Sequence, residues 1–400
     1  MKHSPHIHLH VDPIFSDELQ QLPWHIPIAE WSAHGIKTLD IKRGISRHVV
    51  IFVKTGRFSF AIKEISEEIS KKEIENYERL LLMGIHTLIP AGYVVREEEP
   101  IEVNTPIGIQ YEKNRISHTV TLLVEKVLPD SLLYSRNFRK ENRQKIWDAI
   151  VRLFVQLHSN GVYWGDSSLA NTLIRFEKQD IPFVGKRTTL MAYLSDAETV
   201  EIHSELSQSM READIHFFLE SMDWINEDLK ASGIIRDELA TAEDKQYILD
   251  SYAMLYTTEQ KKKAFERLTS LNIDKFLGSV AHPSYVELFI KHIEEHQRYM
   301  GERFQQPPPL STVARHWYET VFAPVCEIFR REGVTNLLPG KTAAELYIEI
   351  MTSKYYLSEK KGYDVGMTAA AEDYLTRLVP KEYEETVKHI TKNISSYFGV

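Results

Sequence analysis

The character of the chain changes near Pro129, and this change constrains the fold more than any other feature of the sequence. Before it, short runs rich in Val, Ile and Phe alternate with turn signals, and one helical stretch interrupts them. After it, helical periodicity dominates. A small sheet with one helix, followed by a mostly helical remainder, predicts an α+β protein.

The first part of the chain predicts three strands, one helix and two more strands. The strand-like runs are 37–42, 48–54, 57–65, 91–97 and 119–127. The helix is SEEISKKEIENYERLLLMG, residues 66–84, with Ile69, Ile74, Tyr77 and Leu81 on one face and Gly84 at its end. Residues 1–35 lack a clear period and predict an extended segment.

The second part begins with a helix over 141–161, whose apolar face is Ile146, Ile150, Leu153, Phe154 and Leu157. Strand-like runs at 171–176 and 190–198 follow, and beyond 205 nearly all of the chain predicts helix. Thr342 and Glu345 form a capping box at a helix start. The expected domains are an extended segment at 1–35, a sheet-and-helix domain at 36–126, a mostly helical domain at 127–280 and a helical extension at 281–400.

Five polar residues occupy positions that suit phosphoryl transfer, where catalysis is mostly positioning and charge neutralisation. Lys63 lies in the third strand-like run and Glu73 on the following helix. Asp166 and Asn171 lie on a loop between a helix and a strand, and Asp196 ends a later strand.

Each residue type has a role in that chemistry. A strand lysine can hold phosphates as a point charge, and the helix glutamate can pair with it. Asn171 and Asp196 supply the oxygen ligands that Mg²⁺ prefers. Asp166 can accept the proton of an attacking hydroxyl. Asp-x4-Asn alone is a weak signal, but its combination with Lys63 and Asp196 in this order is much stronger.

This order resembles the protein-kinase fold, and the match is closest to its bacterial lipopolysaccharide-kinase-like branch. That branch includes an uncharacterised family with a helical C-terminal extension, which is similar to this chain at 161–173, 194–199, 317–325 and 338–347. The resemblance spans residues 25–380. It implies a bilobal fold with ATP and Mg²⁺ in the cleft, and a hinge at 123–127 in which Glu125 and Val127 contact the nucleotide.

Three departures from the family pattern concern the nucleotide site. Trp164 replaces the usual histidine before the catalytic aspartate, and DAE replaces Asp-Phe-Gly at 196–198. An indole donates hydrogen bonds but does not accept them, so Trp164 is expected to do only the packing part of the histidine's work. The phosphate loop RGISRH, residues 43–48, has one glycine. Arg43, Arg47 and His48 are therefore expected to bind phosphate through their side chains.

Each residue also has a structural interpretation without function. Lys63 could protect an edge strand, and Asp166 and Asn171 could form turns. Glu73 has several glutamates beside it on the same helix, namely Glu67, Glu68, Glu75 and Glu78. Asp214 resembles the helix aspartate that braces the catalytic loop of kinases, and the alternative is a surface charge.

Composition and charge narrow the function classes. A net charge of -9 argues against a general nucleic-acid binder. Cys326 is the single cysteine, which excludes an internal disulfide and favours a small buried residue. The chain has no signal-peptide pattern and no apolar run near the ~18 residues of a membrane span, so the expectation is a cytoplasmic protein.

The leading hypothesis is an ATP- and Mg²⁺-dependent transfer of the γ-phosphate to the hydroxyl of a saccharide, another small molecule or a protein. The alternatives are a pseudokinase that senses nucleotide or binds a protein partner through its helical extension, and a kinase-like nucleotidyl transferase. Metal-dependent hydrolysis through His6, His8 and His10 is weaker still, because no (β/α)₈ pattern follows them. A poorly ordered terminus ranks well ahead of it.

Overall fold

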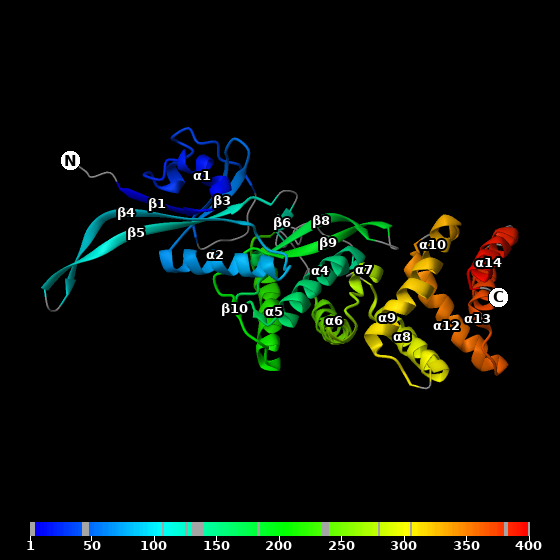
Figure 1. Cartoon of the computed structure of the whole chain (residues 1–400). Coiled ribbons are helices and arrows are strands. Elements are labelled where there is room, and N and C mark those ends of the chain that lie inside the picture. Colours follow the sequence, from blue (N-terminus) through cyan, green and yellow to red (C-terminus); the bar gives the residue numbers. More distant parts are fainter. Residues whose placement is uncertain are drawn as a thin grey trace. The chain divides into compact units, whose positions relative to one another are not determined.

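The computed structural model describes residues 5–41, 48–105, 108–124, 127–129, 140–181, 185–233, 240–278, 281–304, 306–338, 340–379 and 383–398. Two compact units divide the chain, residues 1–177 with 190–253 and residues 178–189 with 254–400. The first unit holds a small antiparallel sheet with helices, and the second is mainly helical (Figure 1). The predicted α+β class is confirmed. The domain boundaries expected at 35/36, 126/127 and 280/281 stay predictions.

Five antiparallel strands form the main sheet in the order β1-β4-β5-β3-β2. Their bounds are His6–Val11 for β1, Val50–Lys54 for β2, Ser59–Ile65 for β3, Pro90–Thr105 for β4 and Gly108–Leu122 for β5. Lys63 lies on β3 and is paired with Thr119 of β5. Strand β3 has a neighbouring strand on each side, β5 and β2. The alternative of an edge-strand lysine is therefore wrong.

The N-terminal segment belongs to this sheet and its core. Helix α1, Pro13–Gln20, packs on the sheet face that carries Phe60, and the 3-10 helix η1 spans Ile28–Glu30. Trp24 and Trp31 are 3% and 0% exposed in the same core. The extended segment expected at the N-terminus is thus a strand and two short helices that bury aromatic side chains.

One predicted strand is absent from the sheet. Of the predicted run 37–42, residues 37–41 are described, and they contribute a single isolated bridge, between Thr38 and Val53. The fifth strand is β1 instead, which pairs with β4 at the opposite edge of the sheet. The alternation of β1 places its isoleucine, leucine and valine toward the core and its histidines outward.

Helix α2, Glu67–Leu82, covers the other face of the sheet (Figure 1). The Ser66 hydroxyl caps it by accepting from the Ile69 N–H. Its buried residues are Ser70, Glu73, Ile74, Asn76, Tyr77 and Leu80. Ile69 and Leu81 were expected on the buried face but are 37% and 38% exposed. The helix is rotated so that polar side chains face inward.

Helix α4, Lys140–Ser159, buries all five residues of its predicted apolar face. It ends before Gly161, which has φ +76°, and a Cβ there would lie 2.2 Å from the His203 carbonyl oxygen. Only glycine fits this close approach. The loop that carries the candidate catalytic residues starts directly after this point.

Short elements frame that loop. Strand β7, Val162–Tyr163, pairs with β10, Glu201–Ile202, and the 3-10 helix η2 spans Leu169–Asn171. A second sheet has the order β6-β8-β9. Its strands are Val127–Pro129 for β6, Thr172–Ile181 for β8 and Gly185–Leu194 for β9. Helix α5, Gln208–Ala231, follows.

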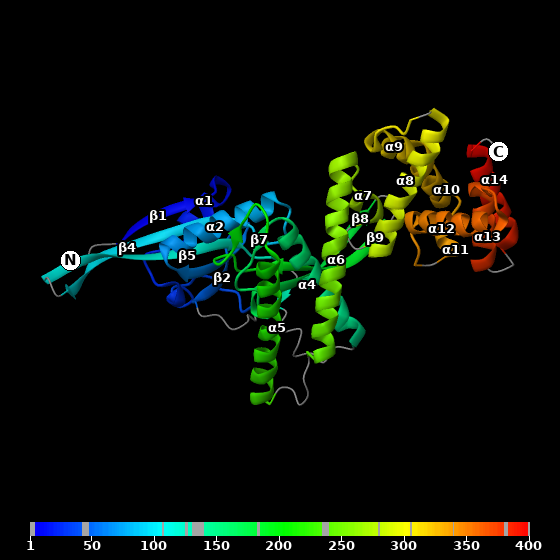
Figure 2. The ribbon, with the colours of Figure 1, turned by 90° about the horizontal axis from the view of Figure 1, so that it is seen from below.

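The rest of the chain is helical. Its elements are α6, Ala242–Thr269; α7, Asp274–Leu277; α8, Pro283–Phe304; α9, Leu310–Trp317; η3, Tyr318–Phe322; α10, Ala323–Arg331; α11, Val334–Leu337; α12, Ala343–Lys361; α13, Gly366–Leu378; and α14, Glu384–Phe398. Helix α13 packs between α12 and α14 (Figure 2). Cys326 is fully buried, and Thr342 and Glu345 form the predicted capping box. Among the described residues, no helix combines the length and apolar character needed to cross a membrane.

His292 of α8 makes this helical core sensitive to acid. The side chain is 5% exposed and packs beside Tyr347, with 6.2 Å between the ring centroids. Burial, reinforced by the charges of Lys291 and Lys354, lowers the pKa of His292 from 6.5 to about 4. Between these two values the unfolded chain takes up a proton that the folded chain does not.

The free energy of unfolding should therefore fall as the pH is lowered from 6.5 to 4, by up to about 3 kcal/mol from this residue. Urea unfolding at pH 7 and pH 4.5 measures the loss, and His292→Leu should remove this part of it. The exposed His282 provides the control, because His282→Leu should leave the loss unchanged. If the free energy of unfolding falls by the same amount between pH 7 and pH 4.5 in wild type and in His292→Leu, the prediction is contradicted.

Candidate active site

Lys63 projects from β3 into a group of three carboxylates. Its Nζ lies 3.4 Å from Glu73 Oε1, 2.9 Å from Asp196 Oδ2 and 3.0 Å from Glu198 Oε2. The lysine side chain is only 15% exposed. Burial disfavours the ammonium, but the three carboxylates outweigh burial and raise the pKa of Lys63. Lys63 is therefore a stable cation held on a rigid strand.

Glu73 is fixed by hydrogen bonds as well as by the lysine. It is 1% exposed, its Oε2 accepts from the Thr119 hydroxyl at 3.0 Å, and its Oε1 lies 3.0 Å from the Tyr77 hydroxyl. Burial raises the pKa of Glu73 to about 7, the charge of Asp196 adds to the rise and that of Lys63 opposes it. The ion pair with Lys63 offsets part of the cost of burying this carboxylate.

The structure also distinguishes Glu73 from the other glutamates of α2. Glu68, Glu75 and Glu78 are exposed, and Glu67 pairs with Arg115 at 2.7 Å. These four glutamates lie on the solvated face of the helix. Glu73 is buried against the sheet instead.

Polar side chains of α2 also hold the segment that follows β9. The Asn76 amide donates to the carbonyls of Ala197 and Val200 at 2.8 and 3.1 Å. The Tyr77 hydroxyl lies 2.8 Å from the Ser195 carbonyl. These contacts explain why the helix buries a polar face, because the face positions the chain on both sides of the Asp196 carboxylate.

Asp166 and Asn171 are joined within their loop. The Asn171 Nδ2 donates to the Asp166 Oδ2 at 3.1 Å and to the Asp166 carbonyl at 3.0 Å. The Ser195 N–H donates to the Asn171 carbonyl at 3.0 Å. The bond from Ser195 places the end of this loop beside the end of β9, so the loop and Asp196 belong to one site.

Asp214 of α5 anchors the start of the loop. It is fully buried, and it accepts from the Trp164 N–H at 2.7 Å and from the Gly165 N–H at 2.8 Å. The His158 Nε2 lies 3.2 Å from the same carboxylate. Gly165 has φ +82°, a conformation that favours glycine. The alternative of a surface helix charge at Asp214 is wrong.

Trp164 does more than the packing expected of it. The ring is fully buried, and its Nε1 donates to the Asp196 carbonyl at 3.2 Å. The Thr199 hydroxyl donates to the Trp164 carbonyl at 2.8 Å. The indole therefore connects the loop of Asp166 to the segment of Asp196 by a hydrogen bond that needs only a donor.

Loss of the Asp214 carboxylate should destabilise the first unit. Asp214→Ala leaves the buried Trp164 N–H and the half-buried Gly165 N–H without their acceptor, and an unsatisfied buried group costs about 1 to 3 kcal/mol. We expect urea unfolding to show a loss of about 3 kcal/mol in all. The exposed Asp228 lies on the same helix, so Asp228→Ala should change stability little. Equal stability of Asp214→Ala and wild type would falsify the anchoring role.

Glu198 is the site residue that the sequence analysis did not identify. Its Oε2 contacts Lys63 and lies 3.9 Å from the His48 Nε2. The available signal was its position two residues after Asp196, in place of the usual glycine. Asp196, Glu198 and Asn171 together offer the oxygen atoms that suit Mg²⁺.

The other predicted site residues are Arg43, Arg47, Glu125 and Val127. Arg43, Arg47 and Glu125 lie outside the described residues. Val127 lies in β6 opposite Arg175, within the second sheet.

The histidines of β1, His6, His8 and His10, are exposed and ordered in a strand. In the part of the chain that the structure describes, no three His, Cys, Asp or Glu side chains are grouped to hold a metal ion. A metal beside Lys63 would therefore need Asn171 as a ligand in addition to carboxylates.

Comparison with known proteins gives a family match in the helical part. A family model described as a domain of unknown function (DUF4032) matches residues 249–379. This range contains the segments 317–325 and 338–347 that carried part of the family resemblance. No curated protein matches the sequence.

Several solved structures that align with the chain are kinases or phosphotransferases. WaaP in complex with acyl carrier protein is 14% identical with a TM-score of 0.37, over 62% of this chain and 88% of that one. The Rio2 kinase ADP/Mg²⁺-phosphoaspartate complex from Chaetomium thermophilum is 14% identical with a TM-score of 0.29, over 56% and 63%. An aminoglycoside-3'-phosphotransferase of type VIII is 13% identical with a TM-score of 0.28, over 60% and 100%. At this level of similarity these proteins do not define the function of this chain.

Proposed function

We propose that this chain is a kinase-like phosphotransferase that moves the γ-phosphate of ATP to a hydroxyl with the help of Mg²⁺. The observation that carries the proposal is the Lys63–Glu73 ion pair beside Asp196. A buried strand lysine held by a helix carboxylate, next to a second carboxylate, is an arrangement suited to a phosphate chain and its metal. The loop that carries Asp166 and Asn171 contacts the end of β9, because the Asn171 carbonyl accepts a hydrogen bond from the Ser195 N–H.

The residues divide the work as follows. Lys63 binds the α- and β-phosphates as a point charge, and Glu73 aims it. Asp196, Asn171 and Glu198 supply oxygen ligands for Mg²⁺, which neutralises the phosphate charge when bound. Asp196 and Glu198 also contact Lys63, so the same carboxylates would serve both the lysine and a bound Mg²⁺.

Asp166 accepts the proton of the acceptor hydroxyl as that hydroxyl attacks. Its Oδ2 is oriented by the Asn171 amide, so one oxygen is held while the other is left to face the hydroxyl. The Asp214 anchor keeps the loop backbone in place during the transfer.

The nucleotide contacts beyond the cluster follow from the family resemblance. Arg43 and Arg47 are proposed to bind phosphates through their guanidinium groups, and Glu125 and Val127 to contact the adenine. The acceptor is a saccharide, another small molecule or a protein side chain. We propose a cytoplasmic enzyme whose helical part offers a surface to a protein partner.

A second candidate, a pseudokinase that binds nucleotide without turnover, is favoured by one observation. Glu198 contacts Lys63 at 3.0 Å and competes there with any phosphate. The set of Asp166, Asn171 and Asp196 favours the enzyme, because a protein that only binds nucleotide has no need of a proton acceptor.

Consumption of γ-labelled ATP separates the two candidates. The enzyme should transfer label to water or to an added hydroxyl acceptor, and only with Mg²⁺ present. For each saccharide, small-molecule or protein acceptor, the rate of ATP consumption is compared with the rate of ATP hydrolysis measured without an acceptor. Mg²⁺-dependent ATP binding without any consumption in all of these reactions would support the pseudokinase.

A further inference from the structure

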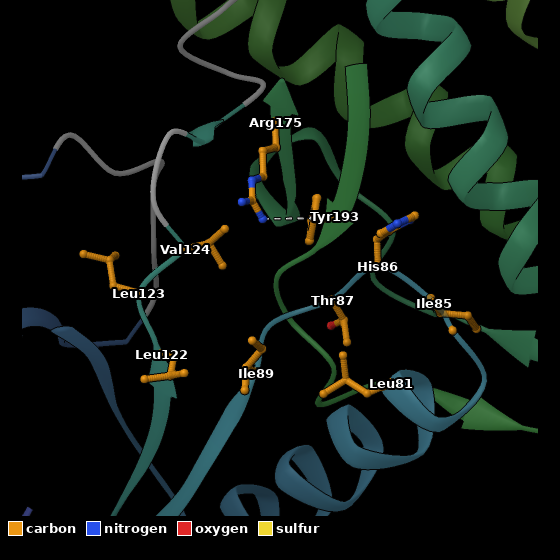
Figure 3. Close-up of a pocket in the computed structure, with 11 residues that line it drawn as sticks. Leu81, Ile85, His86, Thr87, Ile89, Leu122, Leu123, Val124, Arg175 and Tyr193 are labelled. Atoms are coloured by element: carbon orange, nitrogen blue, oxygen red, sulfur yellow. Dashed lines mark hydrogen bonds between the residues drawn. The ribbon is translucent and has the colours of Figure 1, made fainter. Parts of the chain in front are cut away.

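A cavity of about 520 Å³ lies in the first unit, apart from the Lys63 cluster (Figure 3). Its walls are the end of α2 with the turn that follows, the end of β5 with the next two residues, and single residues of β8 and β9. No described lining residue contacts Lys63 or its carboxylates. The volume is in the range of sites that hold small molecules.

One wall of the cavity is aliphatic. Its side chains are Leu81, Ile85, Ile89, Leu122, Leu123 and Val124. Leu81 and Ile89 remain 38% and 47% exposed in this concave wall. Covering such surface gains about 25 cal/mol per Å², so the wall favours an apolar ligand segment.

Among the described residues that line the cavity, Arg175 is a cation at the opposite end, and only part of its donors are used. The Arg175 Nη1 donates a hydrogen bond to the Tyr193 hydroxyl at 3.4 Å. The same Nη1 lies 3.6 Å from Glu177 Oε1, with which it forms an ion pair. Among the described residues, Nε and Nη2 on the other edge of the guanidinium have no hydrogen-bond or ion-pair partner, so this edge can make a two-point contact, the geometry that a carboxylate fits. Figure 3 shows the Arg175 side chain extending from β8 between Tyr193 and Val124, above the aliphatic wall.

The other polar groups limit the charge of a ligand. Burial lowers the pKa of His86, so His86 is not a second cation near neutral pH. The Thr87 hydroxyl is occupied, since it donates to the Leu194 carbonyl at 2.8 Å. Glu177 adds a negative charge beside Arg175. A single carboxylate fits this balance better than a doubly charged phosphate.

We propose that the cavity binds a small amphipathic carboxylate. The carboxylate lies on Nε and Nη2 of Arg175, and an aliphatic chain lies along Leu81 and Ile89. The proposal does not depend on phosphoryl transfer. The walls of the cavity are nevertheless connected to the candidate active site. Helix α2 carries Glu73, and β9 leads to Asp196. The Leu123 N–H donates to the Ser59 carbonyl of β3, the strand that carries Lys63.

Calorimetric titration of the full chain with decanoate tests the proposal. Wild type should bind one decanoate, and decanol, which has the same chain without the charge, should bind at least about tenfold more weakly. Arg175→Gln should weaken decanoate by about 10- to 100-fold, as expected for hydrogen bonds to a charged group. Ile89→Gln should weaken both compounds, because it places an amide in the aliphatic wall.

Leu82→Gln is the matched control, since Leu82 is 88% exposed and does not line the cavity. This variant should bind decanoate like wild type. The proposal is overturned if wild type shows no saturable decanoate binding, or if decanol binds as tightly as decanoate. It is also overturned if folded Arg175→Gln, checked by circular dichroism, keeps the wild-type affinity.

Discussion

Replacing Asp166 with Asn should slow phosphoryl transfer by about three orders of magnitude while leaving ATP binding almost unchanged. The amide cannot take the proton of the acceptor hydroxyl. Its oxygen can still accept the hydrogen bond that the Asn171 amide donates to Asp166 Oδ2, so the loop keeps its shape. Single-turnover transfer from γ-labelled ATP measures the rate, and calorimetry measures the affinity.

An aspartate of the same unit serves as the control for this experiment. Asp40 is exposed and makes no hydrogen bond or ion pair among the described residues, so Asp40→Asn should turn over like wild type. A wild-type rate in Asp166→Asn contradicts the assigned role. Loss of ATP binding together with the rate would show that Asp166 supports the site rather than the proton transfer.

Replacing Lys63 with Met should lower the free energy of unfolding by about 3 kcal/mol at pH 8, because breaking a buried charge pair leaves unpaired charge. Glu73, Asp196 and Glu198 would then face one another without a cation. The same change should weaken Mg²⁺·ATP binding by about 10- to 100-fold, the usual value of hydrogen bonds to a charged group. Urea unfolding and calorimetry measure the two effects.

Two further variants make this result specific. Lys54 lies on the neighbouring strand with an exposed side chain, so Lys54→Met should change neither quantity. Adding Glu198→Gln to Lys63→Met should restore part of the lost stability, since it removes one of the unpaired carboxylates. Stability equal to wild type in Lys63→Met would mean that the lysine does not balance the carboxylates.

Much of the first unit could be predicted from local sequence patterns. The alternation in 57–65 places Lys63 on a strand, and the periodicity of 141–161 gives the buried face of α4. The order of Lys63, Glu73 and Asp196 along these elements was enough to predict that they share a site. Such patterns succeed where neighbouring residues along the chain decide the structure.

The misses come from contacts between distant residues. The buried face of α2 contains the polar Glu73 and Asn76 beside the predicted Ile74 and Tyr77, so a search for apolar periodicity selects a face that is only partly right. The N-terminal core depends on Trp24 and Trp31, which lie in a segment, residues 1–35, without a clear apolar period. Long-range packing of polar and aromatic groups leaves no regular signal in the sequence.

Glu198 illustrates the same limit at the active site. A carboxylate where the resembled family has glycine is a departure from the motif, and the local sequence does not show which residue it contacts. Only the fold shows that Glu198 reaches Lys63, because the two residues are 135 positions apart.

Calorimetric titration of wild type and Asp196→Ala with ATP, with and without Mg²⁺, tests the central claim most directly. Asp196 contacts Lys63 at 2.9 Å and is the proposed metal ligand at the end of β9. The account predicts ATP binding that requires Mg²⁺ in wild type and is lost in Asp196→Ala. Absence of ATP binding by folded wild type, or equal Mg²⁺-dependent binding by the variant, would contradict it.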